Sequence, residues 1–399
     1  MDNLIKNSAI CLLPWNATAI RPSGMALPCC RFNISDPNLF LKESNINLDF
    51  RNSKKWIETR EKMLLGEKIS SCFRCYRDEE SGSESMRTLS LKQYSNENLN
   101  SLDVNLLPFL TLPTDVNVLP ISFLEIAFSN LCNLSCVSCN SFYSSSWATE
   151  DYRNGRSLLN KKSLIENNFD TSQIDLDNLS ILKIIGGEPF MDQQKFISLL
   201  KKINLKKLTI IISTNGTILP NDELKSLLDQ CNRVVLSVSL DGIGLVNDWY
   251  RWPSKFAKIT EVLNQYTSWW GYNSKFLLEI HSVINIYNIW TLDKIVLFIN
   301  EFYPLWGMDF DWIVTPTWQN ISILPFSFKK TLIDKLTVWN KDIKSNVRFN
   351  KSNPFTVSID RLNDNSIGSL EEFKSRSIML AKERNLDLLE MIPHLKEIF

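Results

Sequence analysis

Three cysteines, Cys132, Cys136 and Cys139, stand close together in one loop with C-x3-C-x2-C spacing. Thiolates this close in the chain can all turn toward one inorganic centre, whereas pairing among themselves would leave one thiol over. A cubane 4Fe–4S cluster has one more iron than the triplet has cysteines, so one iron stays open to an outside ligand. The alternative is a zinc knuckle or unrelated thiols, but a structural zinc site uses four ligands, commonly in C-x2-C pairs. We therefore expect these cysteines to hold a catalytic cluster.

Glycine-containing polar turns follow the next three predicted strands. Gly186-Gly187-Glu188-Pro189 ends the first, Thr214-Asn215-Gly216 the second, and Leu240-Asp241-Gly242 the third, with Arg251 shortly after. Glycine lets the backbone approach a ligand closely, and a carboxylate suits an ammonium group. Each turn alone is common in α/β proteins, but their order along the chain is a stronger signal.

The cysteine spacing and these turns resemble the signature of the radical S-adenosylmethionine (SAM) enzymes. The resemblance implies that the methionine part of SAM takes the open iron. It also implies that the reduced cluster cleaves SAM to methionine and a 5′-deoxyadenosyl radical, which takes a hydrogen atom from an unactivated C–H bond. Arg251 could meet SAM or merely pair with an acid. The cofactor-binding residues implied are Gly186, Gly187, Glu188, Pro189, Ser213, Asn215, Ser239, Arg251 and Tyr143.

A second group of cysteines lies in the first hundred residues: Cys11, the adjacent pair Cys29 and Cys30, and the C-x2-C pair Cys72 and Cys75. Four thiolates are enough to close a cluster or to hold one zinc ion. Neighbouring side chains diverge in extended chain, so only one of the adjacent pair is expected to be a ligand, with Cys29 slightly favoured.

This N-terminal pattern is similar to the auxiliary-cluster modules called SPASM and twitch, in which a cysteine precedes a short hairpin with a Gly turn. The resemblance implies a second, auxiliary 4Fe–4S cluster on Cys11, Cys29, Cys72 and Cys75. Such modules usually follow the barrel, whereas this one precedes it, which leaves the ligand set open. A structural zinc ribbon is the alternative. We also expect the module to lie over the C-terminal ends of the barrel strands.

Between residues 120 and 325, strand-like and helix-like segments alternate, which indicates an α/β fold with a parallel sheet and right-handed crossovers. Six such units match the partial (β/α)6 barrel of the radical SAM enzymes. The expected domains are an auxiliary module at 1–95, a linker at 96–119, the barrel at 120–325 and a C-terminal helical extension at 326–399. The predicted strands are 122–129, 181–185, 208–213, 233–239, 276–284 and 310–314.

The amino-acid composition limits which binding partners and which cellular compartment are expected. Lys plus Arg equals Asp plus Glu at 44 each among the 399 residues, so no global basic field gathers nucleic acid. No apolar run reaches membrane-spanning length, so no membrane association is expected. Nine clustered cysteines without an export signal indicate metal ligands in a reducing, cytoplasmic setting. The chemistry implied needs an electron donor such as flavodoxin or ferredoxin.

The substrate is the least constrained feature. Auxiliary-cluster enzymes that the chain resembles mostly modify peptides or proteins, so we expect post-translational modification of a peptide or protein. A dehydrogenase or rearrangement enzyme acting on a small sugar or nucleotide is an alternative. A non-enzymatic scaffold holding Fe–S or zinc is another. Cys231 and His281 are more simply a buried inert thiol and a core histidine than participants in the reaction.

Overall fold

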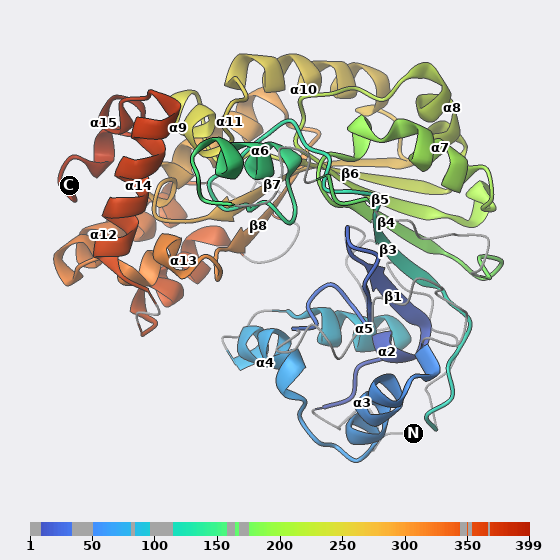
Figure 1. Cartoon of the computed structure of the whole chain (residues 1–399). Coiled ribbons are helices and arrows are strands. Elements are labelled where there is room, and N and C mark those ends of the chain that lie inside the picture. The colour runs from blue at the N-terminus through green and yellow to red at the C-terminus, as the bar shows by residue number, and fades with distance from the viewer. Residues whose placement is uncertain are drawn as a thin grey trace. The chain divides into compact units, whose positions relative to one another are not determined.

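The computed structural model is an α/β fold (Figure 1), and it describes residues 9–33, 51–80, 84–95, 115–157, 164–166, 175–343, 349, 353–365 and 368–399. Its strands follow the order β2-β1-β3-β4-β5-β6-β7-β8 in the sheet. The strands are β1 Ala17–Ile20, β2 Ala26–Leu27, β3 Phe123–Ala127, β4 Ile181–Ile185, β5 Thr209–Thr214, β6 Arg233–Ser239, β7 Phe276–Ile284 and β8 Gly307–Trp312.

The helices include those expected between the strands. Helix α7, for example, begins soon after Pro189, and the side chain of Asn221 caps the start of α8. The helices are α2 Leu13–Asn16, α3 Lys54–Leu64, α4 Phe73–Glu80, α5 Met86–Ser95, α6 Ser145–Arg153, α7 Gln193–Leu200, α8 Asp222–Gln230, α9 Leu245–Tyr250, α10 Phe256–Trp270, α11 Leu292–Phe302, α12 Phe326–Asp342, α13 Pro354–Asn363, α14 Leu370–Arg384 and α15 Leu388–Met391.

The chain divides into two compact units, each described by itself below. The first comprises Met1–Leu131, Leu164–Ser213 and Pro220–Val235, and the second Cys132–Ser163, Thr214–Leu219 and Leu236–Phe399. The predicted N-terminal module therefore shares a unit with the first barrel strands. The helices expected beyond residue 325 lie in the second unit.

In the first unit, a short hairpin extends the sheet at the edge of β3. Strand β1 pairs in parallel with β3, with Ala17 opposite Phe123, and β2 pairs antiparallel with β1. The turn between β1 and β2 contains Gly24 at a φ of 81°, a left-handed conformation that favours glycine. The hairpin thus covers the backbone edge that β3 would otherwise leave open for pairing.

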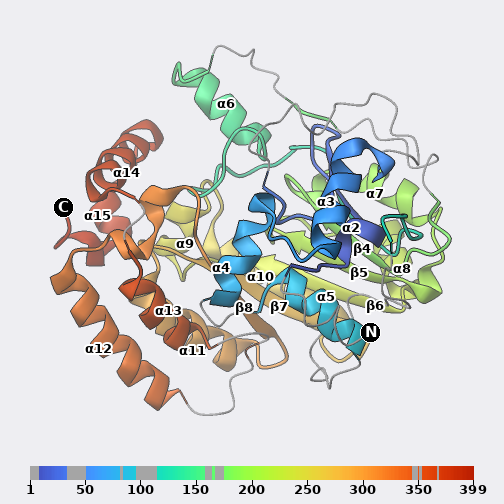
Figure 2. The ribbon, with the colours of Figure 1, turned by 90° about the horizontal axis from the view of Figure 1, so that it is seen from below.

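The two faces of this half of the sheet differ in burial. Ala19, Glu125, Lys183 and Ile211 are register partners across β1, β3, β4 and β5, so they share one face. On that face, apolar residues near the strand starts pack with α3 of the N-terminal module, and Figure 2 shows α3 from this side. Side chains on the opposite face are fully buried, and Figure 1 shows α7 and α8 along that side: Leu124, Leu182, Ile184, Ile210 and Ile212.

The second unit contains the parallel pair β7 and β8, with Glu279 opposite Gly307. Helices α12 to α15 form the C-terminal extension predicted from the sequence. One attachment of this extension is polar, because the Tyr287 hydroxyl lies 2.6 Å from the hydroxyl of Ser377 in α14. Phe373 of α14 packs against the Tyr287 ring, with ring centroids 5.1 Å apart.

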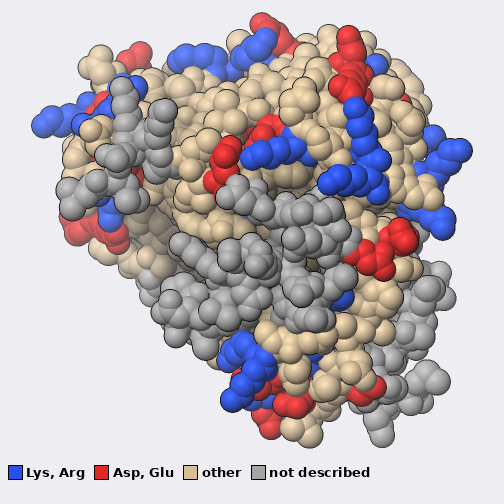
Figure 3. All heavy atoms as spheres, turned by 45° about the vertical axis from the view of Figure 1, so that its right-hand side comes forward, with Lys and Arg blue, Asp and Glu red and all other residues tan. Residues whose placement is uncertain are grey.

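Charged side chains of both signs are interspersed on the face shown in Figure 3, which fits the equal numbers of basic and acidic residues in the sequence. In the described part of the chain, no helix combines the length and the apolar character that crossing a bilayer requires.

Two buried arginines attach the segment before β3 to the N-terminal module. Arg51 donates to the carbonyl of Trp15 at 3.0 Å and to that of Leu119 at 2.8 Å. Arg60, which is fully buried in α3, donates to the carbonyl of Val116 at 2.6 Å. Residues 96–114 of the predicted linker lie outside the described residues, but its last part is therefore held against the module.

Replacing Arg60 with Met should lower the free energy of unfolding by about 1–3 kcal/mol, because a buried carbonyl loses its charged donor. Chemical denaturation measures this difference. Lys54→Met, at an exposed position of the same helix, is the matched control and should change stability by less than about 0.5 kcal/mol. Equal stabilities for the two variants would contradict the structural role of Arg60.

Candidate functional site

The cysteine triplet lies in a loop of the second unit, where N–H donors approach its sulfur atoms. The backbone N of Leu134 lies 3.4 Å from Cys132 Sγ, and Asn215 Nδ2 lies 3.9 Å from the same atom. Arg251 Nη1 lies 4.0 Å from Cys136 Sγ. Donors around thiolate sulfur stabilise its negative charge and tune the potential of an iron–sulfur cluster. The donor set thus fits a cluster ligated by this loop.

Burial raises the pKa of Cys136, and the neighbouring guanidinium of Arg251 opposes this rise. Burial and the adjacent Cys136 thiol raise the pKa of Cys139 to about 12. Protonated thiols are thus the stable form without a metal, because a bare thiolate is costly to bury. A cluster bound here would take the place of the protons.

The backbone of the loop is held by side chains from several elements. Val137 donates its N–H to the carbonyl of Tyr250 at 2.8 Å, and Gln319 Nε2 donates to the carbonyl of Val137 at 2.8 Å. The indole of Trp147 in α6 donates to the carbonyl of Cys136 at 2.7 Å. These contacts fix the direction in which the cysteines project.

Arg384, the last residue of α14, also holds this loop, although the sequence pattern of the C-terminal region indicated no chemistry. Its side chain is 2% exposed, and Nη2 donates to the carbonyl of Ser135 at 2.7 Å. Nε donates to Glu150 at 3.1 Å, and the guanidinium lies 5.2 Å from the ring centroid of Trp147. An arginine in a helix-rich tail gives no local signal, because its partners are far away in the chain.

Arg251 pairs with a buried acid rather than one on the surface. Its Nη2 lies 2.7 Å from Asp241 Oδ2, and both residues are buried. Burial lowers the pKa of Arg251, but Asp241 and the other neighbours outweigh it, so the net shift is upward. Asp241 is itself oriented by the backbone N–H of Val283 at 2.7 Å. The turn after β6 thus positions Arg251 beside Cys136.

The Gly-Gly-Glu-Pro turn lies in the first unit, directly after β4. Gly186 has a φ of 94°, and a Cβ on Gly187 would lie 2.0 Å from the carbonyl oxygen of Leu131. The backbone N–H of Glu188 donates to that same oxygen at 2.6 Å. Glu188 is 2% exposed, and its Oε1 accepts the N–H of Phe190 at 3.1 Å at the start of a short 3₁₀ helix that begins with Pro189.

The other predicted cofactor residues occupy strand ends and loops. Half-buried Ser213 lies near the end of β5 in the first unit, and half-buried Ser239 ends β6 in the second. In the second unit, Asn215 Nδ2 donates to Asn133 Oδ1 at 2.8 Å, which joins the turn after β5 to the cysteine loop. Tyr143 is half-buried beyond the triplet, with its ring 4.8 Å from that of Phe142.

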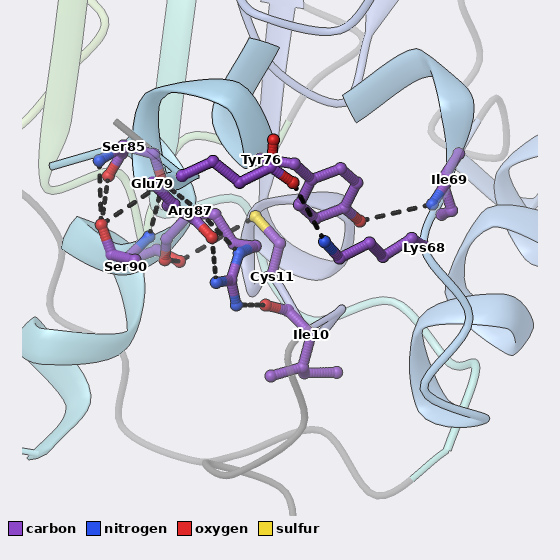
Figure 4. A network of polar contacts seen from close by, with 11 residues as sticks. Ile10, Cys11, Lys68, Ile69, Tyr76, Glu79, Ser85, Arg87 and Ser90 are labelled. Atoms are coloured by element: carbon purple, nitrogen blue, oxygen red, sulfur yellow. Dashed lines mark hydrogen bonds and ion pairs between the residues drawn. The ribbon is translucent and has the colours of Figure 1, made fainter. Parts of the chain in front are cut away.

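A polar network in the first unit surrounds Cys11 (Figure 4). Arg87 donates to Glu79 Oε1 at 2.9 Å and to the carbonyl of Ile10 at 3.2 Å. The sulfur of Cys11 lies 3.9 Å from the hydroxyl of Ser90. These contacts join the segment before β1 to α4 and α5. The Cys11 segment and the C-x2-C pair at the start of α4 are therefore parts of one packed structure.

The adjacent cysteines Cys29 and Cys30 differ in the groups that influence their pKa values. Burial is the largest cause of the raised pKa of Cys29. The neighbouring thiol of Cys30 raises this pKa further, and so do the thiols of Cys11, Cys72 and Cys75. Burial also raises the pKa of Cys30, and the next largest influences on it are the charged side chains of Glu125, Lys183, Arg21 and Arg31. Cys29 also belongs with Cys11 to one buried cluster, and Cys72 packs against that cluster. Among the described residues, no group of three or more His, Cys, Asp or Glu stands at the spacing of a single metal ion.

The hairpin register directs the chain toward the strand starts before Cys29, whereas the sequence predicted that the module lies over the C-terminal ends of the strands. Leu27 pairs with Ala19, and the antiparallel direction carries the chain back toward the start of β1 before it reaches Cys29. Cys11 and Cys29 accordingly pack in one apolar cluster with Phe123, the first residue of β3. The antiparallel turn is the physical reason for the difference.

Cys231 and His281 have ordinary structural surroundings. Cys231 is fully buried after α8, and its sulfur lies 3.6 Å from the carbonyl of Leu227. His281 of β7 lies with Nε2 3.2 Å from Asp311 Oδ2 on the neighbouring strand. Neither contact indicates that Cys231 or His281 takes part in the proposed reaction.

Replacing Arg384 with Met should weaken the cysteine loop, because Glu150 loses its buried partner and the Ser135 carbonyl its donor. We expect the free energy of unfolding to fall by about 3 kcal/mol and a bound cluster to be lost faster to an iron chelator, followed by visible absorption. Arg376→Met, in the same helix at an exposed ion pair, is the control and should lose its cluster at the wild-type rate. Equal rates for both variants would show that Arg384 does not support the loop.

Comparison with known proteins supports an iron–sulfur centre. Residues 125–243 match the family model of a 4Fe-4S single cluster domain, a segment that contains the cysteine triplet and all three turns. No curated protein matches the chain. Several solved structures are similar to part of this chain. The similar region covers 60% of the first protein named below and 47% of the second.

One similar structure is described as native anSMEcpe with bound AdoMet; it is 19% identical over 55% of this chain and 60% of that chain, with a TM-score of 0.38. Another is SuiB of Streptococcus suis, 14% identical over 56% of this chain and 47% of that chain, with a TM-score of 0.35. The α/β fold and the matched domain agree with the sequence motifs. The match of residues 125–243 to a 4Fe-4S single cluster domain agrees with the iron–sulfur cluster that the cysteine triplet predicts.

Proposed function

We propose that this protein is a radical SAM enzyme whose catalytic cluster is held by Cys132, Cys136 and Cys139. The observation that carries the proposal is the cysteine loop, which presents three half-buried cysteines beside the N–H donors of Leu134 and Arg251. When bound, the cluster and SAM would supply one-electron cleavage of SAM and abstraction of a hydrogen atom from a substrate C–H bond. A flavodoxin or ferredoxin would supply the electron.

The Gly-Gly-Glu-Pro turn would hold the methionine part of SAM. Gly187 has no room for a side chain because its backbone lies against that of Leu131, and Glu188 brings a buried carboxylate to the same turn. A buried carboxylate is a strong acceptor for an ammonium group. Ser213, Asn215, Ser239, Arg251 and Tyr143 complete the proposed cofactor-binding set, each at a strand end or loop.

We assign Cys11, Cys29, Cys72 and Cys75 to an auxiliary 4Fe–4S cluster. Cys11 and Cys29 pack in one buried cluster with Cys72 against it, and the thiols of Cys11, Cys72 and Cys75 contribute to the raised pKa of Cys29. The four cysteines come from three separate segments, and the Arg87 network joins the Cys11 segment to helix α4, which contains Cys75. A structural zinc site on the same thiols is the second candidate.

The substrate class proposed is a peptide or protein, which the enzyme would modify after translation. The support is the auxiliary-type cysteine module, because the enzymes whose modules it resembles act mostly on peptides. Dehydrogenation or rearrangement of a small sugar or nucleotide is the alternative reaction. A scaffold that only binds a partner is less well supported, because it has no use for the close approach at Gly187 or for a buried Glu188 beside it.

Changing Cys132, Cys136 and Cys139 together to Ala should abolish formation of 5′-deoxyadenosine from SAM and dithionite under anaerobic conditions. Iron bound at the N-terminal cysteines should remain. Cys231→Ala is the control, because this buried cysteine belongs to neither set, and it should keep full SAM cleavage. Cleavage by the triple variant at the wild-type rate would refute the assignment.

Cys29→Ala should remove the iron of one cluster, about half of the total for two clusters of equal size, whereas Cys30→Ala should retain it. The two substitutions are one residue apart and equally conservative, so the comparison separates ligation from packing. Iron and zinc are counted on anaerobically purified protein. Stoichiometric zinc lost from Cys29→Ala would favour the structural zinc site, and equal losses from both variants would refute the choice of Cys29.

A further inference from the structure

Cys136 and Arg251 lie opposite each other on two backbone segments of the second unit that run in opposite directions. The N–H groups on either side of Cys136 donate to the carbonyls on either side of Arg251, at 2.6 Å and 2.8 Å: Ser135 to Trp252 and Val137 to Tyr250. This register brings the arginine side chain beside the thiol, where Nη1 lies 4.0 Å from Cys136 Sγ. The backbone thus places the guanidinium at one particular cysteine of the triplet.

The other end of the guanidinium is held by Asp241. Arg251 Nη2 lies 2.7 Å from Asp241 Oδ2, and the Oδ1 atom of the same carboxylate accepts the N–H of Val283 at 2.7 Å. Asn247 joins the two charged residues, because its side-chain oxygen accepts the N–H of Asp241 at 3.2 Å and its carbonyl accepts the N–H of Arg251 at 2.8 Å. Arg251 is therefore fixed through both its backbone and its side chain.

The guanidinium is buried and keeps donor capacity beyond its pair with Asp241. Arg251 is 8% exposed and Asp241 is 1% exposed, so water and salt screen these charges weakly. The Nε atom of Arg251 is buried and has no hydrogen-bond acceptor among the described residues. The arginine can thus serve a second negatively charged group besides Asp241. The Cys136 thiolate of a bound cluster is such a group.

A fixed cation beside a cluster ligand acts on the reduction potential of the cluster. When the proposed flavodoxin or ferredoxin passes one electron to the cluster, the charge of the cluster becomes more negative by one. A nearby positive charge stabilises this reduced state more than the oxidised state. Hydrogen bonds to the sulfur atoms and the local net charge are among the factors that set such potentials.

We propose that Arg251 raises the reduction potential of the catalytic cluster through its contact with Cys136, and that Asp241 holds it in place for this. The effect is exerted on the cysteine rather than on SAM, so it is present before SAM binds. This inference rests on the proposed function, because it names a residue that regulates the cluster of that same enzyme.

The test is a redox titration of the anaerobically reconstituted full-length protein without SAM, followed by electron paramagnetic resonance. The signal of the catalytic cluster is the one that the triple alanine variant of the cysteine loop lacks. Arg251→Met should lower the equilibrium constant for one-electron reduction of this cluster about tenfold, because a charge-assisted contact is lost. For a one-electron couple, this corresponds to a midpoint potential about 59 mV more negative. Arg251→Lys restores the charge and should keep part of the wild-type potential.

The matched control is Lys255→Met. Lys255 is also a cation paired with an acid in the same segment, since its Nζ lies 3.6 Å from Asp248 Oδ2, but its side chain is 64% exposed. Because solvent screens exposed charges, this variant should have the wild-type potential. An equal shift in Lys255→Met and Arg251→Met would show that any lost cation has the same effect, and would overturn the role given to Arg251.

Because Arg251→Met leaves Asp241 buried without its partner, the double variant Arg251→Met with Asp241→Asn is measured as well. Its potential should shift in the same direction by less, because the opposing charge of the acid is also gone. Wild-type potentials in both variants would overturn the inference, including the case in which Arg251→Met weakens SAM binding alone. Loss of the cluster from both variants would place Arg251 in cluster assembly and also overturn it.

SAM cleavage is measured on the same samples to separate this inference from the proposed function. SAM cleavage by the wild type, combined with unchanged potentials in the Arg251 variants, overturns the role of Arg251 alone. The expected shift in potential, combined with no SAM cleavage by the wild type, overturns the proposed function alone.

Discussion

The close approach of two backbone segments at Gly187 is the constraint on which the first unit's part of the candidate site depends. A Cβ at this position would lie 2.0 Å from the carbonyl oxygen of Leu131, and that oxygen also accepts the N–H of Glu188. The chain leaving β3 is thereby held against the turn after β4. Because Leu131 directly precedes Cys132, the same contact sets where the cysteine loop begins. Only glycine permits it, since any side chain would push the two segments apart.

The cysteine loop itself is kept in place by buried polar contacts rather than by regular structure. Trp147, Gln319 and Arg384 each bind a backbone carbonyl of the loop. A loop with few apolar residues of its own gains rigidity when distant side chains satisfy its backbone groups. Such rigidity matters for a redox centre, because the donors around each sulfur must keep their distances in both charge states.

The N-terminal module is attached to the edge of the sheet by its own hairpin. Its hairpin pairs with β3, which places Arg21, just after β1, 3.7 Å from Glu125 of β3. Apolar residues near the strand starts anchor the module, and charged residues take the middle of the strands on the same face. The apolar contacts stabilise the attachment, and the buried carboxylate of Glu125 is paired with cations because an unpaired buried charge is costly.

Much of the architecture could be predicted from the sequence alone. Strands at 181–185, 233–239 and 276–284 agree with β4, β6 and β7, because apolar runs bounded by turn residues are local signals. The cysteine triplet and the glycine turns were equally visible, since their spacing is local too. Only the tertiary structure decided that Cys29 packs in one cluster with Cys11, that Arg384 holds the cysteine loop, and that Glu125 meets Lys183 and Arg21. Those contacts join residues far apart in the chain, and pairing across strands and helices leaves no mark in the local pattern.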